Sequence, residues 1–328
     1  MRAVVCEDWC EPEGLSVGDL PEPVMVENGV RIAVRAAGVN FADTLMIRGE
    51  YQVRPPHPFS PGLEVAGDVI ECAPGVSRSK LGDRVMSTVH YGGFAEQVIA
   101  DQADVHVIPD AMDFVTAAAF PVVYGTSHIG LKDKLVLQPG ETLLVNGAAG
   151  GVGLTAVEIG KKLGATVIAT AGGAEKLAVA KQYGADHLID YRSEDIRARV
   201  KALTEGRGVD AVFDPVGGSA FDASLRAVTQ RGRILVVGFA SGTVPQIPAN
   251  LLLVKNISVI GYYWGAHRFL DPQLVDRSFA ELLDWYQDGA LKPHVSKTYD
   301  LAEVADALAD LTGRRSTGKL VLTTETRH

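Results

Sequence analysis

The chain has few cysteines and no excess of basic residues, and each shortage excludes a class of protein. Its three cysteines, Cys6, Cys10 and Cys72, cannot all pair and form no CxxC motif. A disulfide scaffold is therefore not expected, and a four-cysteine zinc site is excluded. The 31 Lys and Arg residues are outnumbered by 40 Asp and Glu residues, which gives a formal charge of −9. We therefore expect no broad nucleic-acid-binding surface.

Long apolar runs are also missing. No stretch approaches the roughly 18 apolar residues of a membrane span. The first residues, MRAVVCEDWC, meet an acidic residue at Glu7 without an apolar secretory segment, so we expect a cytoplasmic protein without membrane contact. The eight histidines are scattered and no HExxH motif occurs, so the pattern predicts no bound metal.

Glycine is what the chain has in excess. Glycine accounts for 35 of the 328 residues, above the average of about 7%, and it follows no collagen period. Hydrophobic residues make up 47% and charged residues 22%, a composition typical of globular proteins, and the length suits about two domains. The glycines should therefore serve turns or the close approach of backbone to a ligand.

The pattern of predicted elements changes near residue 120. Before it, short β-like runs such as VRIAVRA (30–36) and LEVAGDVIEC (63–72) alternate with proline and glycine turns. This pattern predicts a twisted, partly closed antiparallel barrel. The last section is expected to be helical over 273–287 and 301–311, and to end in a strand over 319–323.

After about residue 140, near-continuous apolar strands alternate with helices. This alternation predicts a parallel sheet with both faces covered. Ser193 and Ser219 are predicted to cap two of the helices at their N-termini. The predicted strands span 141–146, 166–171, 187–190, 209–214, 234–239 and 257–262, and the clearest helices span 152–163 and 174–183.

A glycine-rich loop, NGAAGGVG, occupies 146–153 between a predicted strand and a predicted helix. The spacing Ala148-x-Gly150-x-x-Gly153 matches the dinucleotide fingerprint, with Ala in place of its first glycine. Gly150 lets the backbone approach a pyrophosphate, and Gly153 lets the helix pack closely on the strand. The free N–H groups at the helix start would then face the phosphates.

The residues after the second strand of this pattern favour NADPH over NADH. An acidic residue there would bind the ribose 2′-hydroxyl and repel a 2′-phosphate. Here the strand ends in Thr170-Ala171-Gly172-Gly173, and the first carboxylate, Glu175, comes later than usual. Lys176 can neutralise a 2′-phosphate, for which Gly172 leaves room, although a solvent-facing helix lysine is the common alternative for any single lysine.

Taken together, these motifs resemble the medium-chain dehydrogenase/reductase superfamily and, within it, the zinc-independent quinone oxidoreductases. The resemblance implies an α/β fold. In this fold, the resemblance further implies, a Rossmann domain with a doubly wound parallel sheet, residues 123–267, is inserted into a GroES-like, mainly β-barrel catalytic domain, residues 1–122 plus 268–328. It also implies a homodimer built through the edge of the Rossmann sheet. The segments that carry it are AAGVNFADTLMIRGEY (36–51), PGLEVAGDV (61–69), NGAAGGVG (146–153), VDAVFDPVGG (209–218), GFASG (238–242) and PANLLLVKNISVIGYYWG (248–265).

Two departures from the superfamily's zinc enzymes narrow the expected chemistry. Zinc alcohol dehydrogenases place a Cys ligand in the loop that here reads VNFAD (39–43), and a His before Glu in the segment that reads GLE (62–64). Asn40 and Leu63 cannot replace a thiolate and an imidazole. Simple alcohol oxidation is therefore not expected. The resemblance implies hydride transfer from NADPH to quinones or α,β-unsaturated carbonyl compounds, whose developing charge is delocalised onto oxygen.

The resemblance also assigns site residues. Tyr51 matches a tyrosine that donates a proton in related enoyl reductases, but it equally fits a residue that lines the cleft. Asn40 and Thr126 are implied to lie near the nicotinamide, and Arg314 or Arg315 to reach the phosphate. The expected catalytic residues are thus Tyr51 and Asn40, and the expected cofactor contacts are Asn40, Thr126, Ala149, Gly150, Gly151, Val152, Gly172, Lys176, Tyr191, Phe239, Ala240 and Arg315.

Two other functions stay open at this point. An enoyl-thioester (enoyl-CoA) reductase would need a basic path for the CoA phosphates, for which Arg48, Arg54 and Arg268 are weak candidates. A redox sensor or structural protein that binds NADPH with little turnover would carry the same nucleotide fingerprint.

Overall fold

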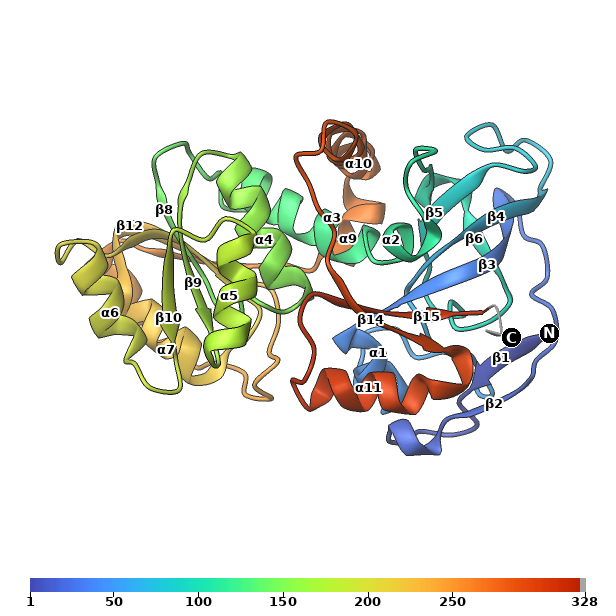
Figure 1. Ribbon diagram of the computed structural model, residues 1–328, viewed down its shortest axis with the longest axis horizontal. Helices are drawn as coiled ribbons and strands as arrows, with labels where there is room; N and C mark the ends of the chain where they lie inside the picture. The colour runs from blue at the N-terminus through green and yellow to red at the C-terminus, as the bar shows by residue number, and fades with distance from the viewer. Residues whose placement is uncertain (325–328) are drawn as a thin grey trace. The chain divides into compact units, whose positions relative to one another are not determined.

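The computed structural model describes residues 1–324, and the chain divides into two compact units. Met1–Val122 and Pro293–His328 form the first unit, and Val123–Lys292 form the second (Figure 1). No helix within residues 1–324 is long and apolar enough to cross a bilayer. The expected cytoplasmic location stays a prediction.

The second unit contains a six-stranded parallel sheet. Its strand order, β10-β9-β8-β11-β12-β13, is the 3-2-1-4-5-6 order of a Rossmann fold, so the predicted doubly wound sheet is confirmed. The central strands are buried on both faces, which explains their continuous apolar sequences. The strands are β8 (Thr142–Val145), β9 (Thr166–Ala171), β10 (His187–Asp190), β11 (Val209–Asp214), β12 (Val228–Val236) and β13 (Ser258–Gly261).

Helices cover both faces of this sheet. In Figure 1, α4 (Gly151–Lys162) and α5 (Ala174–Gln182) lie on one face, and α6 (Ile196–Leu203) and α7 (Gly218–Ala227) on the other. A single turn of glycine-rich chain separates β8 from α4. The carboxyl ends of the parallel strands therefore meet along one edge, where ligands of such folds bind.

Two predicted helix caps are wrong. Helix α6 starts after Asp195, whose Oδ1 accepts a hydrogen bond from Ala198 N at 2.7 Å, and not after Ser193. A carboxylate at this position satisfies a free N–H and complements the helix dipole. Helix α7 starts after Gly217, whose φ of 71° suits glycine, so Ser219 lies inside the helix.

The segment 268–292, which we expected in the catalytic domain, packs within the second unit. Its main helix, α10 (Pro272–Gln287), is held by His128, whose Nδ1 lies 2.8 Å from Ser278 Oγ. The other ring nitrogen, Nε2, lies 3.1 Å from Glu281 Oε2. His128 comes from α3 (Pro121–Ile129), which precedes the Rossmann sheet in the chain. The remaining helices of this unit are α8 (Ala249–Lys255) and α9 (Trp264–Leu270).

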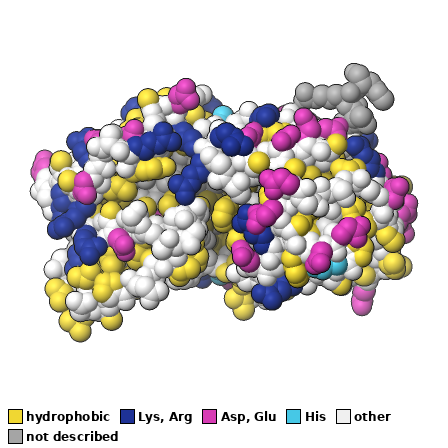
Figure 2. Space-filling model, turned by 90° about the horizontal axis from the view of Figure 1, so that it is seen from below, with side chains coloured by type: hydrophobic (Ala, Val, Ile, Leu, Met, Phe, Trp, Pro, Cys, Tyr) yellow, Lys and Arg dark blue, Asp and Glu magenta, His cyan; other side chains and the backbone are white. Residues whose placement is uncertain are grey.

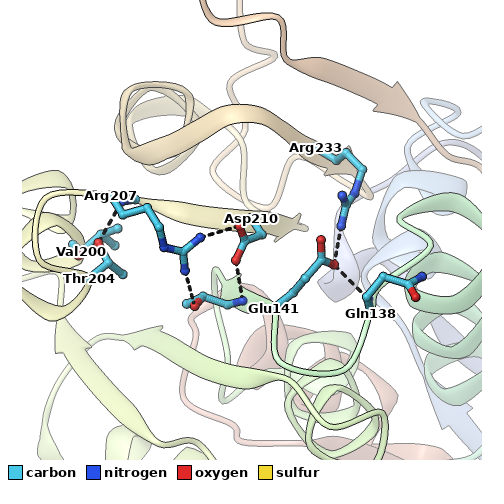
Figure 3. A network of polar contacts seen from close by, with 9 residues as sticks. Gln138, Glu141, Val200, Thr204, Arg207, Asp210 and Arg233 are labelled. Atoms are coloured by element: carbon cyan, nitrogen blue, oxygen red, sulfur yellow. Dashed lines mark hydrogen bonds and ion pairs between the residues drawn. The ribbon is translucent and has the colours of Figure 1, made fainter.

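Polar side chains of the protein itself occupy the amino edge of the sheet. Arg207 pairs with Asp210 at 2.5 Å, and Asp210 Oδ2 accepts from Thr142 N at 2.8 Å (Figure 3). Next to them, Arg233 pairs with Glu141 at 2.5 Å. A recess of about 250 Å³ opens beside Arg207, but its guanidinium already faces Asp210. The opposite, carboxyl edge is thus the better candidate for a ligand site.

The first unit is built on a seven-stranded, mainly antiparallel sheet. Strand β15, late in the chain, pairs with β3, which comes early, with Leu320 opposite Val39, so segments far apart in the sequence belong to one sheet. The path is β14 (Val295–Asp300), β15 (Lys319–Thr323), β3 (Gly29–Val39), β4 (Glu64–Cys72), β5 (Arg84–Thr88) and β7 (Val105–Val107), with β6 (Gln97–Asp101) on β3. A hairpin of β1 (Arg2–Val5) and β2 (Ser16–Asp19) and the helices α1 (Phe41–Ile47), α2 (Phe114–Ala118) and α11 (Val304–Thr312) complete the unit.

Candidate functional site

The glycine loop lies at the carboxyl edge of the parallel sheet, between β8 and α4. A Cβ at Gly153 would lie 2.2 Å from Gly147 O, so only glycine fits there. A Cβ at Gly150 would meet only Gly147 O, at an ordinary 3.5 Å. Packing within the protein therefore does not require glycine at position 150, which is exposed. The bare backbone at Gly150 leaves open space of the kind that a pyrophosphate needs.

The start of α4 adds hydrogen-bond donors to this loop. The first bond across the helix start runs from Leu154 N to Gly150 O at 2.8 Å. The N–H groups of Gly151, Val152 and Gly153 precede it, where a helix offers them no acceptor of its own. Ala149 lies on the same turn and is buried. Free N–H groups and the positive end of the helix dipole together favour an anion.

A buried polar frame fixes the first residue of the loop. Asn146 Nδ2 donates to Asp214 Oδ1 and to Ser224 Oγ, both at 3.0 Å. Its Oδ1 accepts from Thr170 Oγ1 at 3.2 Å. Burial raises the pKa of Asp214, which also accepts from Gly217 N at 3.1 Å. The ends of β8, β9 and β11 are thus held together under the loop.

Beyond β9, along the same edge, side chains pack directly against the backbone of a second pair of glycines, Gly172 and Gly173. A Cβ at Gly172 would lie 2.7 Å from the Tyr191 hydroxyl and 2.8 Å from Arg192 Nε. The Tyr191 ring follows β10 and is 41% exposed. Lys176 lies half-buried in the first turn of α5. The structure therefore brings Gly172 and Tyr191 together, with Arg192 beside them, a residue that was not among the predicted contacts. The roles of Gly172, Lys176 and Tyr191 toward a cofactor stay predictions.

Three further predicted contacts belong to the second unit. Phe239 and Ala240 follow β12 at the same edge and are exposed, and Ala240 N donates to Pro215 O at 3.1 Å. Thr126 lies in α3, is 8% exposed, and its carbonyl accepts from the Tyr262 hydroxyl at 3.1 Å. Their roles toward a cofactor stay predictions.

In the first unit, Asn40 belongs to a buried charged cluster. Lys319 Nζ lies 2.7 Å from Glu64 Oε1, and it donates to Asn40 Oδ1 at 2.8 Å and to Val39 O at 2.6 Å. The side chains of Lys319 and Glu64 are 5% and 0% exposed. The second carboxylate oxygen, Glu64 Oε2, accepts from Val122 N at 2.8 Å. A buried cation thus bridges the loop before α1 and strand β4.

This cluster fixes how Asn40 can act. Its Nδ2 donates to Glu64 Oε1 at 2.8 Å and to Gly38 O at 3.3 Å, so both amide protons are already used. Only acceptor capacity on Oδ1 is left for a ligand. The backbone N–H of Asn40 donates to Asp43 Oδ2 at 2.7 Å, and burial raises the pKa of Asp43 to about 7. Neither Lys319 nor Asp43 was predicted, although a lysine that opens the apolar strand KLVLT was a usable signal.

The other two predicted residues of the first unit lie elsewhere in it. Tyr51 is half-buried and packs against the barrel core. Arg315 Nε pairs with Asp310 Oδ1 at 2.7 Å, and its side chain is 60% exposed. The structure does not join Arg315 to the cluster around Asn40. The roles proposed for Tyr51 and Arg315 stay predictions.

Two family models match this chain, one within each of its two units. Residues 26–110 match the alcohol dehydrogenase GroES-like domain, and residues 151–287 match the zinc-binding dehydrogenase family. A quinone oxidoreductase-like protein 2 homolog of Nematostella vectensis is 42% identical over 327 residues, which cover 99% of this chain and 89% of that protein. The chain belongs to the quinone oxidoreductase family of medium-chain dehydrogenases/reductases.

Solved structures of this family share the whole fold. Escherichia coli quinone oxidoreductase complexed with NADPH has a TM-score of 0.92 at 29% identity, covering 98% of this chain and 100% of that one. A mycobacterial protein complexed with NADPH has a TM-score of 0.93 at 34% identity, with the same coverage. The resemblance drawn from the sequence is thus confirmed at the level of family and fold. Within residues 1–324, no three His, Cys, Asp or Glu residues are grouped so that they could hold a metal.

Proposed function

We propose that this oxidoreductase binds NADPH and reduces quinones or α,β-unsaturated carbonyl compounds. The observation that carries the proposal is the glycine loop, where Gly150 leaves space that the packing of the protein does not require. Two structural neighbours described as complexed with NADPH support the choice of cofactor. When bound, NADPH supplies a hydride.

Different residues of the chain bind different parts of NADPH. The N–H groups that open α4 hold the pyrophosphate, with Ala149, Gly150, Gly151 and Val152 on that turn. The adenosine end is formed by Gly172, Lys176 and Tyr191. None of these residues is acidic, so none of them would repel a 2′-phosphate. Thr126, Phe239, Ala240, Asn40 and Arg315 complete the expected cofactor contacts.

The cluster around Lys319 supports a mechanism without a metal. The ammonium group of Lys319 already occupies oxygen atoms of Asn40 and Glu64. A divalent cation at these oxygens would meet a buried positive charge 2.7 Å from Glu64 Oε1. The acceptor must therefore be electrophilic by itself, as quinones and enones are. Tyr51 is the residue that we propose to donate a hydrogen bond or proton to the developing enolate.

A homodimer is the second part of the proposal. Strand β13 lies at one edge of the six-stranded sheet and is only partly buried. Helix α8, which precedes it, exposes Leu253 by 76% and Val254 by 66%. An edge strand with large exposed apolar neighbours fits pairing with a second copy. Light scattering tests this: Leu253→Glu should turn a dimer into a monomer, and a monomeric wild-type protein would refute the pairing.

The decisive experiment is an assay of NADPH oxidation at 340 nm with one quinone, one enone and one enoyl-CoA. Turnover with the quinone or the enone supports the proposal. Turnover with the enoyl-CoA alone would assign the protein as an enoyl-thioester reductase. Tight NADPH binding without turnover of any acceptor would favour a redox sensor or structural protein. On the face shown in Figure 2, basic, acidic and apolar side chains all occur.

A further inference from the structure

Two cysteine thiols lie against each other just after β1. Cys6 Sγ and Cys10 Sγ are 3.9 Å apart, so that one thiol donates a hydrogen bond to the other. Cys6 Sγ also lies 3.2 Å from Asp8 O. All three cysteines of the chain are free thiols, and the third, Cys72, contacts Ser79 O instead. Cys6 and Cys10 therefore form a dithiol pair to which the proposed hydride transfer gives no role.

The two thiols differ in how firmly they are held and in how well a reagent reaches them. Cys6 is fully buried, and its backbone N–H and C=O both pair with Phe59, at 2.8 and 3.2 Å. Cys10 is partly exposed, and its backbone N–H donates to Ile47 O at 2.9 Å. Formation of a disulfide would shorten the separation of the sulfur atoms from 3.9 Å to about 2.05 Å. Because Cys6 is held on both sides, Cys10 is the residue that would move.

The residues on either side of Cys10 contact the turn that follows α1. The indole of Trp9 lies on Gly49, where a Cβ would be 2.9 Å from the nearest ring atom. Glu11 Oε2 accepts from Arg48 Nε at 3.0 Å. Together with the hydrogen bond from Cys10 N, these contacts join the chain around Cys10 to the end of α1. A movement of Cys10 therefore changes the contacts of this turn.

The dithiol pair has neither the ligands of a metal site nor the acidity of a nucleophilic thiol. In the part of the chain that the structure describes, no third His, Cys, Asp or Glu residue completes a metal site with the two cysteines. Burial raises the pKa of the Cys6 thiol to about 12, and it also raises the pKa of Cys10. Few thiolates are thus present at neutral pH. The chemistry left to the pair is its slow oxidation to a disulfide.

We propose that Cys6 and Cys10 form a modification site, which oxidised glutathione or another low-molecular-weight disulfide converts into an intramolecular disulfide. The Cys10 thiolate attacks one sulfur atom of oxidised glutathione, which forms a mixed disulfide and releases one glutathione thiolate. The Cys6 thiolate then attacks Cys10 Sγ and releases the second glutathione thiolate. The two cysteines give up two protons, and the two released thiolates take up two protons. One disulfide is reduced and one is formed, so no other oxidant is needed.

The new disulfide acts on the turn that leads to Tyr51. Movement of Cys10 toward Cys6 weakens its hydrogen bond to Ile47 O and shifts Trp9 relative to Gly49. Backbone amides of 9–11 and 47–51 should therefore exchange with solvent faster in the oxidised chain. The dithiol site does not depend on the proposed function, whereas any effect on turnover would rest on it, because that effect would act through Tyr51.

The test exposes the full-length chain to oxidised glutathione and counts free thiols by alkylation and mass spectrometry. The wild-type chain should fall from three free thiols to one, retain no glutathione, and regain all three thiols with dithiothreitol. The matched control Cys72→Ser should lose both of its thiols at the wild-type rate. Cys6→Ser should instead retain glutathione on Cys10, because it lacks the thiol that displaces it. A rise from pH 7 to pH 8 should speed the oxidation about tenfold, since both thiols have a raised pKa.

Several results would overturn the dithiol site. One is a folded wild-type chain that keeps three free thiols under conditions that oxidise the urea-unfolded chain. Others are glutathione that persists on wild-type Cys10, or a disulfide between two chains, since either would show that Cys6 does not reach Cys10. Equal hydrogen exchange of 9–11 and 47–51 in the reduced and oxidised chains would refute the effect on the turn. None of these measurements needs NADPH or an acceptor, so they decide the site even if the chain proves not to be a reductase.

Discussion

Replacing Lys319 by methionine removes the only cation of the cluster formed by Lys319, Glu64 and Asn40. At 2.7 Å and an effective dielectric constant of about 20, its attraction to Glu64 amounts to about 6 kcal/mol. Desolvation of the two buried ions offsets several kcal/mol for each of them, so the pair contributes little net stability. Lys319→Met alone, however, leaves the Glu64 carboxylate buried without compensation. We therefore expect a loss of about 3–5 kcal/mol in the free energy of unfolding.

The double substitution Glu64→Gln with Lys319→Met is the control. Glutamine keeps an oxygen that accepts from Val122 N, and methionine approximates the length of the lysine stem. Because no charge is left unpaired, the double variant should recover most of the loss, with a coupling free energy of about 2 kcal/mol or more. Urea unfolding followed by circular dichroism gives these energies. Hydrogen exchange in β3 and β15 assigns them to the first unit, since two units need not unfold together.

Two results would refute this reasoning. If K319M lowered the free energy of unfolding by less than about 1 kcal/mol, the Glu64 carboxylate would not be left both charged and shielded from water. A double variant as unstable as the sum of the two single variants would show that the charges are not coupled.

Three further predictions follow from the same residues. Burial raises the pKa of Asp43 from 3.8 to about 7, so the folded chain retains a proton that the unfolded chain releases. Stability should fall as the pH rises from about 4 to about 7, and Asp43→Asn should flatten this slope in urea midpoints. Gly150→Ala should keep the wild-type melting temperature and weaken NADPH binding, whereas Gly153→Ala should lower both; equal melting losses would contradict the close contact at Gly153. Tyr51→Phe should reduce kcat for an enone at least about tenfold and spare a quinone, and unchanged rates with both acceptors would remove Tyr51 from the mechanism.

The strands of the second unit were predictable because their signal is local. The runs 166–171, 187–190 and 209–214 match β9, β10 and β11 residue for residue. The inner strands β9 and β11 are mostly buried, which favours largely apolar sequences, whereas β10 is a partly buried edge strand. The strands β2 (SVGD) and β14 (VSKTYD) were not predicted. Their sequences carry neither an apolar run nor a clear alternation, and only pairing with β1 and β15 makes them strands.

The candidate site likewise has one part with a local sequence signal and other parts that depend on the pairing of distant strands. The glycine-rich loop is one continuous segment, so the spacing of its glycines was enough to predict it. The cluster of Asn40, Glu64 and Lys319 depends on strand register, with Ala37 opposite Val65 and Leu320 opposite Val39. Arg192 likewise reaches Gly172 because Asp190 pairs with Ala171 across β10 and β9. Contacts set by the pairing of distant strands leave no periodic trace in the sequence.

Lys319 and Arg192 show how a chain of net charge −9 can suit an anionic dinucleotide. Lys319 is buried, and its ammonium group contacts three oxygen atoms of its own unit, from Val39, Asn40 and Glu64. Such a cation fixes side chains but has no donor left for a ligand. Arg192 is exposed beside two glycines, and its backbone N–H donates to Asp190 Oδ1. Attraction for a phosphate depends on cations that no carboxylate neutralises and that lie within a few ångströms of it, because salt screens charges beyond about 8–10 Å. The total charge therefore excludes a broad polyanion surface, whereas the pairing of individual cations decides whether one phosphate binds.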